Sequence, residues 1–310
     1  MEIEANKIYH CDNIDLMRQL ANESINVILT DPPYLYLKNQ KLERKFDEQR
    51  FFSECKRILK KDGFIVLFGR GTSFYRWNTI LNDIGFKFKE EVIWDKKNIS
   101  SPMLPINRVH ETISIHTKTN GTINTSRVPY LEMNHKKFDT IHSDLQRFLT
   151  TTKNKKHFEK ISKYLENIEN IENTENAENI SSYRTDFHGM IRGGKFDATV
   201  KSHTYKKSDS AISALQTILF GAKEKSIISV QREQYMTIHP TQKAIRLLER
   251  ILLLTSKEGN LVFDPFSGSG STAEACIKQN RKYICCEIDK EYYDASVNRI
   301  NCTPKNLFAF

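Results

Sequence analysis

Features that would place this chain in several common protein classes are missing from its sequence. Its six cysteines include no CxxC pair and no spacing typical of a disulfide framework, which argues against a zinc site and against a disulfide-stabilised secreted domain. We therefore expect reduced, mostly buried thiols. The cysteines stand at positions 11, 55, 276, 285, 286 and 302.

Membrane and secretion signals are also missing. No run approaches the roughly eighteen apolar residues of a membrane span. The first residues, MEIEANK, are charged and lack the apolar core of a signal peptide. We expect a cytoplasmic protein without a membrane partner.

Acidic residues are fewer than basic ones, 38 against 47, which leaves a net charge of +9 over 310 residues. This excess suggests a polyanionic partner such as nucleic acid, although an ordinary solvated basic surface explains it equally well. The length allows one large core together with a smaller domain or an insertion.

The first third of the chain alternates strand and helix patterns. This rhythm is typical of a mostly parallel sheet with helices on both faces. In the second helix an apolar stripe precedes Gly63, which we expect to end it. The expected strands cover residues 7–11, 26–30, 64–69, 90–96 and 111–118, and the expected helices cover residues 13–20 and 48–63.

The region from residue 119 to 231 is polar, basic and weakly periodic, with scattered aromatic residues. Within it lies a low-complexity tract, ENIENIENTENAEN, at residues 166–179. A period of three drifts around a helix and keeps no single face, so we expect a solvated, dispensable surface insertion here.

Regular patterns resume at residue 232. Thr241 is a plausible N-cap for an apolar helix. A strand, a glycine-rich turn, a helix and a second strand ending in Glu287 follow. Gly268 and Gly270 suit a tight turn that approaches a ligand, and Glu287 can accept hydrogen bonds from ribose hydroxyls. NAD and S-adenosylmethionine both fit such a site, but a carboxylate at Asp264 would disfavour a pyrophosphate and suit a cation.

A second polar site follows the buried strand at residues 26–30, where the sequence reads TDPPY. Asp31 is followed at once by Pro32 and Pro33, which fix the backbone. Either these residues simply end the strand, or they hold a carboxylate rigidly at the edge of the sheet for chemistry.

Three motifs together, TDPPY, HPTQK and FDPFSGSGST in that order, resemble the β group of DNA amino-methyltransferases. The resemblance implies a doubly wound, mostly parallel, seven-stranded Rossmann-like α/β sheet in circularly permuted order. Residues 1–118 would form its catalytic half, residues 119–231 a target-recognition insertion, and residues 232–310 the cofactor-binding half. Implied partners are S-adenosylmethionine and double-stranded DNA. Whether the chain forms a homodimer or has a cognate restriction endonuclease stays open.

The resemblance also implies roles for individual residues. The family pattern usually has proline where this chain has Ala244. His110 and Glu111 match the family's last strand only loosely, and we expect structural roles for them. The implied catalytic residues are Asp31, Pro32, Pro33 and Tyr34. The implied cofactor-binding residues are Asp12, His239, Thr241, Lys243, Asp264, Phe266, Ser267, Gly268, Ser269, Gly270, Thr272 and Glu287. No metal site is expected.

The expected mechanism follows from the chemistry of an exocyclic amine, which is a poor nucleophile because its lone pair is delocalised. Asp31 and the Pro32 carbonyl would accept its two hydrogens, and Tyr34 would stack on the flipped base. The leading hypothesis is methylation of N6 of adenine in DNA, as the resemblance favours. N4 of cytosine, an NAD-dependent oxidoreductase and an inactive DNA-binding relative are the alternatives.

Overall fold

The computed structural model describes residues 3–34, 44–98, 105–134, 220–232 and 242–303, together with Thr217. The low-complexity tract at 166–179 and the candidate residues His239 and Thr241 lie outside these ranges. No helix among the described residues is both long and apolar enough to cross a bilayer. All six cysteines are free thiols, and four of them are buried.

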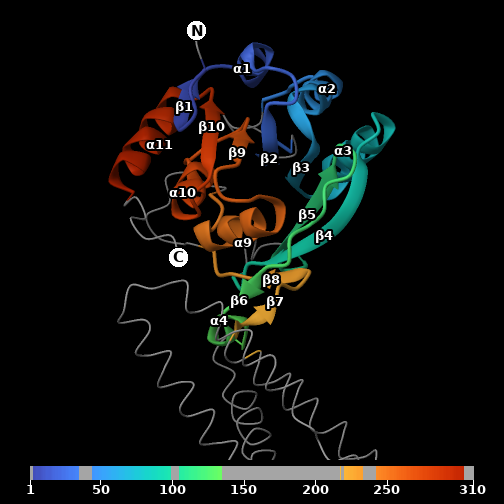
Figure 1. Ribbon diagram of the computed structural model, residues 1–310, viewed down its shortest axis with the longest axis vertical. Helices are drawn as coiled ribbons and strands as arrows, with labels where there is room; N and C mark the ends of the chain where they lie inside the picture. The colour runs from blue at the N-terminus through green and yellow to red at the C-terminus, as the bar shows by residue number, and fades with distance from the viewer. Residues whose placement is uncertain are drawn as a thin grey trace, which may run out of the picture. The chain divides into compact units, whose positions relative to one another are not determined.

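One mixed β-sheet with helices on both faces dominates the structure, and this arrangement confirms the expected α/β fold class (Figure 1). Its strands lie in the order β1-β10-β9-β2-β3-β5-β4-β8. Every neighbouring pair is parallel except the two pairs that involve β5. The strands are β1 (Lys7–His10), β2 (Ile25–Thr30), β3 (Leu59–Gly69), β4 (Lys87–Asp95), β5 (His110–Thr117), β8 (Ile227–Ser229), β9 (Leu261–Asp264) and β10 (Lys282–Glu287).

The described part of the sheet has eight strands, one more than the seven expected. The additional strand is β8, a segment of three residues that pairs in parallel with the end of β4. Its Ile228 is fully buried, so packing holds this short strand at the sheet edge. A segment this short carries no periodic pattern, and the sequence therefore did not predict it.

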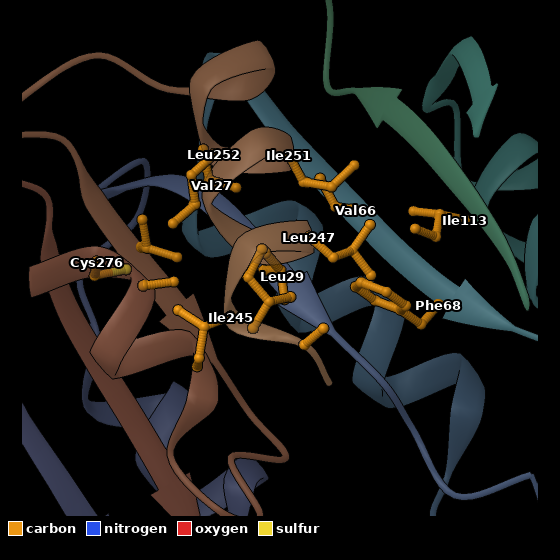
Figure 2. Close-up of a cluster of buried hydrophobic side chains, with 14 of the residues drawn as sticks. Val27, Leu29, Val66, Phe68, Ile113, Ile245, Leu247, Ile251, Leu252 and Cys276 are labelled. Atoms are coloured by element: carbon orange, nitrogen blue, oxygen red, sulfur yellow. The ribbon is translucent and has the colours of Figure 1, made fainter. Parts of the chain in front are cut away.

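Helices cover both faces of the sheet. On one face α9 (Ile245–Thr255), α10 (Ser271–Lys278) and α11 (Lys290–Cys302) pack on the strands. On the other face lie α1 (Asn13–Gln19), α2 (Glu48–Ile58) and α3 (Gly71–Asp83). Side chains alternate along a strand, so successive residues of β2 pack against the helices on opposite faces of the sheet. Figure 2 shows Leu29 of β2 and Phe68 of β3 facing side chains of α9.

Two helix boundaries differ from the sequence predictions. Helix α2 ends at Ile58, and Gly63 lies inside β3 instead of ending the helix. A Cβ at Gly63 would lie 2.8 Å from the Asn26 carbonyl oxygen, so glycine is required by close approach to β2. Helix α9 has Ala244 as its N-cap, without a side-chain cap, instead of Thr241.

The chain divides into two compact units. The first comprises Met1–Ser126 and Glu224–Phe310 and contains the whole eight-stranded sheet. The second comprises Arg127–Lys223. Its described elements are β6 (Arg127–Val128) and β7 (Ala222–Lys223), which pair antiparallel, and α4 (Tyr130–Asn134). The predicted insertion at 119–231 overlaps this unit, while β8 belongs to the main sheet.

Candidate active site

The two candidate motifs meet where β2 and β9 lie side by side. Val27 pairs with Val262 and Ile28 with Phe263 in a parallel register. Asp31 therefore follows β2 at the same edge of the sheet at which Asp264 ends β9. In doubly wound sheets this carboxyl edge is where ligands bind.

Both carboxylate oxygens of Asp31 have partners within the chain. Oδ1 accepts a hydrogen bond from the Tyr34 hydroxyl, and Oδ2 accepts one from the ammonium of Lys243. The Asp31 side chain is mostly buried, with 19% of its surface exposed. Burial raises the pKa of Asp31 above its ordinary value, and Lys243 acts against that rise by favouring the anion.

Tyr34 is fixed by its neighbours at the edge of the sheet. Its carbonyl accepts a hydrogen bond from Ser73 Oγ at 2.8 Å, and its ring lies 6.0 Å from that of Trp77. Only 8% of Tyr34 is exposed. Pro32 and Pro33 lie between the two polar residues and restrict the backbone that joins them. The segment therefore holds Asp31 and Tyr34 in one arrangement.

Lys243 reaches Asp31 from the segment that precedes α9. The family resemblance implies a cofactor-binding role for this residue, and in the structure its ammonium lies between two carboxylates and 5.1 Å from the centre of the Phe68 ring. Glu111 Oε2 is 3.2 Å from Lys243 Nζ. Burial acts to lower the pKa of Lys243, but Asp31 and Glu111 outweigh burial and hold the pKa above its usual value.

Glu111 was assigned a structural role from the sequence, and the structure places it in the same charged cluster. Its Oε1 is 3.2 Å from Lys96 Nζ. Burial acts to raise the pKa of Glu111, but Lys243 and Lys96 keep the pKa below its ordinary value. Because β5 runs antiparallel to β3, its first residues lie at the carboxyl edge of β3, where Thr112 pairs with Gly69. No local sequence pattern identifies Glu111, because its place in the cluster depends on the direction of β5.

The glycine-rich loop connects β9 to α10. Asp264 Oδ1 accepts a hydrogen bond from the Phe266 backbone N–H at 3.0 Å, and Oδ2 accepts one from the Thr272 hydroxyl at 2.5 Å. Burial raises the pKa of Asp264 to about 7, because these neutral donors only partly replace water and the nearby Asp31 and Glu287 repel its charge.

Gly270 has a left-handed conformation, with φ of 76°, and is the residue from which α10 begins. A Cβ there would lie 3.0 Å from the Cβ of Ser296 on α11, so a larger residue would be both strained and crowded. Gly268 also has a positive φ, of 50°. Ser269 and Ser271 lie 3.0 Å apart through their hydroxyls. Glycine thus allows the turn that directs the N–H groups of α10 toward the edge of the sheet.

Glu287 ends β10 and holds the loop in place. Its Oε2 accepts a hydrogen bond from the Gly268 N–H at 2.8 Å, and its Oε1 accepts one from the Asp289 N–H at 2.8 Å. The Ser267 N–H is bonded to the Cys286 carbonyl at 2.9 Å. Strand β1 lies beside β10, with His10 opposite Glu287. The strands therefore bring the loop and its acidic partner together, as the sequence pattern predicted.

Asp12 follows β1 at this same edge of the sheet. Its carboxylate accepts a hydrogen bond from the Ile14 N–H at 2.8 Å and caps α1. Phe266 packs its ring against Phe46 and Phe51, at 5.5 and 5.3 Å between ring centres. Among the described residues no cluster of three or more histidine, cysteine or acidic side chains is arranged to hold a metal ion. The edge thus gathers acids, the first turn of α10 and aromatic rings.

Comparison with known proteins gives a family and several relatives. The family model N6_N4_Mtase, described as DNA methylase, matches residues 25–298. The Type II methyltransferase M.BglII of Bacillus subtilis is 26% identical over 307 residues, which cover 96% of this chain and 70% of the relative. The Type II methyltransferase M.HinfI of Haemophilus influenzae is 24% identical over 317 residues, which cover 95% of this chain and 68% of the relative.

Solved structures share the fold at lower identity. M1.HpyAVI in complex with SAM superimposes with a TM-score of 0.53 and 16% identity, over 95% of this chain and 99% of that one. The PvuII DNA methyltransferase, described as cytosine-N4-specific, superimposes with a TM-score of 0.55 and 16% identity, over 98% of this chain and 88% of that one. These structures support the expected methyltransferase fold.

Proposed function

Since the chain belongs to the DNA methylase family, we propose that it methylates N6 of adenine in double-stranded DNA, on a base flipped out of the helix. The chain is a DNA methyltransferase that uses S-adenosylmethionine, and this identity sets aside the NAD-dependent oxidoreductase that the glycine loop had left open. The observation that carries the proposal is the rigid end of β2, where Asp31 lies at the same sheet edge as the β9 loop.

The chemistry of the loop residues fits the cofactor. When bound, S-adenosylmethionine supplies a methyl group on a positively charged sulfur. A carboxylate at Asp264 suits that cation, and Glu287 keeps acceptor capacity for ribose hydroxyls beyond its two backbone donors. We assign to this site Asp12, Asp264, Phe266, Ser267, Gly268, Ser269, Gly270, Thr272 and Glu287, with His239, Thr241 and Lys243 retained from the family resemblance.

Asp31 and Pro32 act on the target amine in this proposal. A carboxylate oxygen of Asp31 and the carbonyl oxygen of Pro32 accept the two amine hydrogens, which moves the nitrogen toward tetrahedral geometry and frees its lone pair for attack. Pro33 restricts the backbone so that both acceptors are organised before the base arrives. Tyr34 stacks on the base, and its ring favours the positive charge that grows on the nitrogen.

Adenine is the proposed base because aspartate begins the DPPY motif, the pattern that the family resemblance associates with adenine. A restriction–modification setting belongs to the same proposal and is supported by the names of M.BglII and M.HinfI as Type II methyltransferases. The residues that read the DNA sequence are sought in the basic region 119–231.

Expression in a methylation-deficient host, followed by mapping of modified bases, tests the proposal. We expect N6-methyladenine at one short recognition sequence, and DNA from a host carrying Asp31→Ala is the control. N4-methylcytosine instead would overturn the choice of adenine. Unmodified DNA from cells that contain folded, cofactor-binding protein would overturn the transferase role altogether.

The Asp31→Ala variant separates catalysis from cofactor binding. We expect methyl transfer to fall at least about 100-fold, because one preorganised group of this kind contributes about 100- to 1,000-fold. Binding of S-adenosylmethionine, measured by calorimetric titration, should stay within about threefold. A parallel loss of cofactor binding would contradict the role assigned to Asp31.

A further inference from the structure

Four charged side chains form an alternating chain at the edge of the sheet: Asp31, Lys243, Glu111 and Lys96. Each lysine ammonium contacts an acid, and Lys243 contacts two. All four side chains are largely buried, with Lys96 and Lys243 exposing 6% and 9% of their surface. Two positive and two negative groups balance, so the cluster carries no net charge within the protein.

The contacts of Lys243 with its two acids are unequal. Its ammonium donates a hydrogen bond to Asp31 Oδ2, whereas Glu111 Oε2 lies 3.2 Å away without hydrogen-bond geometry. Glu111 Oε2 is buried and accepts no hydrogen bond from any residue that the structure describes. A buried carboxylate oxygen without a donor is unfavourable. Glu111 therefore has an unused acceptor directed at a cation that another acid holds.

The same cluster conflicts with the binding of a substrate. A target amine needs a carboxylate oxygen of Asp31, but the Tyr34 hydroxyl occupies Oδ1 and Lys243 occupies Oδ2. A carboxylate oxygen can accept two hydrogen bonds, but an oxygen that is shared with one of these donors attracts the amine hydrogen less strongly, so departure of a donor favours the reaction. If Lys243 left without a partner, it would become an unpaired buried cation, which is strongly unfavourable.

We propose that Glu111 is a positioning residue that receives the Lys243 ammonium when the target amine takes its place on Asp31. This inference rests on the proposed function, in which Asp31 accepts a hydrogen of the amine. The movement is short, because Nζ is already within ion-pair distance of both acids. Lys243 keeps an acidic partner throughout this movement. A cation–π contact with the face of the Phe68 ring also stabilises its ammonium.

Lys96 has a supporting part in this exchange. Its ion pair with Glu111 favours the ionised carboxylate, which is the form that can receive Lys243. Arg232 also acts on Lys96 by charge. Among the described residues, Tyr34 and Asp264 are further titratable neighbours of Asp31. The exchange thus depends on one carboxylate, Glu111, whose observed partners are Lys96 and Lys243.

Glu111→Gln tests the proposal, with Glu224→Gln as the matched control. Glu224 is also a buried acid in an ion pair, 2.6 Å from Arg250 and away from the cluster. Without Glu111, Lys243 stays on Asp31, and we expect the single-turnover rate to fall about 10- to 100-fold. The acid limb of the pH–rate profile should move to lower pH, because a negative charge near Asp31 is removed.

The control should lose thermal stability but keep the single-turnover rate and the acid limb. Lys96→Met is the second variant, and it keeps the protein testable if Glu111→Gln does not fold. It removes the cation that favours ionised Glu111, so the acid limb should move to higher pH. Binding of S-adenosylmethionine is measured for every variant and should stay unchanged.

The outcomes separate this inference from the proposed function. An active Asp31→Asn variant would overturn the proposed function and the exchange with it. If Asp31→Asn is inactive while Glu111→Gln matches Glu224→Gln in rate and acid limb, only the role of Glu111 is overturned. An unmoved acid limb in Lys96→Met would likewise overturn the exchange.

Discussion

Asp264 is a buried carboxyl group whose two hydrogen-bond donors, the Phe266 N–H and the Thr272 hydroxyl, are both neutral. Burial raises its pKa to about 7, well above the value near 4 of an unfolded chain. The free protein therefore favours the protonated form up to neutral pH. A cationic ligand would reverse this preference, because it stabilises the carboxylate that burial disfavours.

Asp264→Asn should remove a pH-dependent loss of stability from the free protein. A raised folded-state pKa contributes stability that is complete below about pH 4 and is lost as the pH rises through about 7. We compare the free energy of unfolding of the variant with that of the natural protein at each pH. This difference should favour the variant by about 1–3 kcal/mol more at pH 8 than at pH 4. Urea unfolding at both pH values measures this gain.

The same variant should bind S-adenosylmethionine about tenfold more weakly, since a neutral amide cannot pair with a sulfonium. Asp294→Asn is the control, because Asp294 is an exposed acid on α11 and should alter neither property. Equal cofactor affinity in Asp264→Asn and the natural protein would contradict the assignment of Asp264 to the cofactor.

At the scale of elements, a polar contact joins α3 to β5. A ring nitrogen of His116, Nε2, lies 2.8 Å from Asn78 Oδ1, and the His116 ring packs edge-on against Phe88. Only 3% of His116 is exposed. Burial lowers its pKa to about 4, because the charged imidazolium would lose its water. The helix and the strand are thus joined through a histidine that must stay neutral.

Acid should weaken the fold through this histidine. A lowered folded-state pKa gives stability that is present above the unfolded value of about 6.5 and is lost as the pH falls toward 4. Between pH 7 and 4.5 the natural protein should lose about 2–3 kcal/mol of stability relative to His116→Gln, a difference in which the opposite contribution of Asp264 cancels. Urea unfolding between pH 7 and 4.5 measures it. His10→Gln, on the exposed end of β1, should keep the pH dependence of the natural protein.

Element boundaries show why local patterns could not place every turn. The apolar stripe of α2 predicted the helix, but the following residues join β3 because Gly63 must pass close to Asn26. That approach depends on a strand more than thirty residues earlier in the chain. Helix α9 begins after Ala244, and the residue before this cap, Lys243, belongs to the charged cluster.

For the whole molecule, the excess of nine positive charges is consistent with a polyanionic substrate. Lysine and arginine contacts with phosphates release bound cations from DNA, so binding depends on salt. The main sheet and its acids belong to the first unit, which binds the cofactor in our proposal. The expected DNA contacts lie in residues 119–231.

DNA affinity should therefore fall steeply with salt, by about 1,000-fold or more between 50 and 200 mM NaCl if six or more phosphates are contacted. Fluorescence anisotropy with a labelled duplex measures the slope. Binding of S-adenosylmethionine is the internal control, since it involves no phosphate and should change little. A flat salt dependence for DNA would contradict a phosphate-binding role for the basic region.

The sequence by itself determined the fold class, the strand before Asp31, the glycine turn and the acid at Glu287. These features depend on short-range patterns: apolar runs, fixed proline backbones and glycines that permit positive φ. Order along the chain was enough to reveal the permuted arrangement and the family.

Only the tertiary structure decided which charges meet. Lys243 and Asp31 are separated by 212 positions, and Glu111 reaches them because β5 runs antiparallel to its neighbours. Strand direction and register arise from long-range pairing, and no local pattern records them. The sequence could therefore locate the carboxylate at Asp31, but only packing shows that a lysine and a second buried acid surround it.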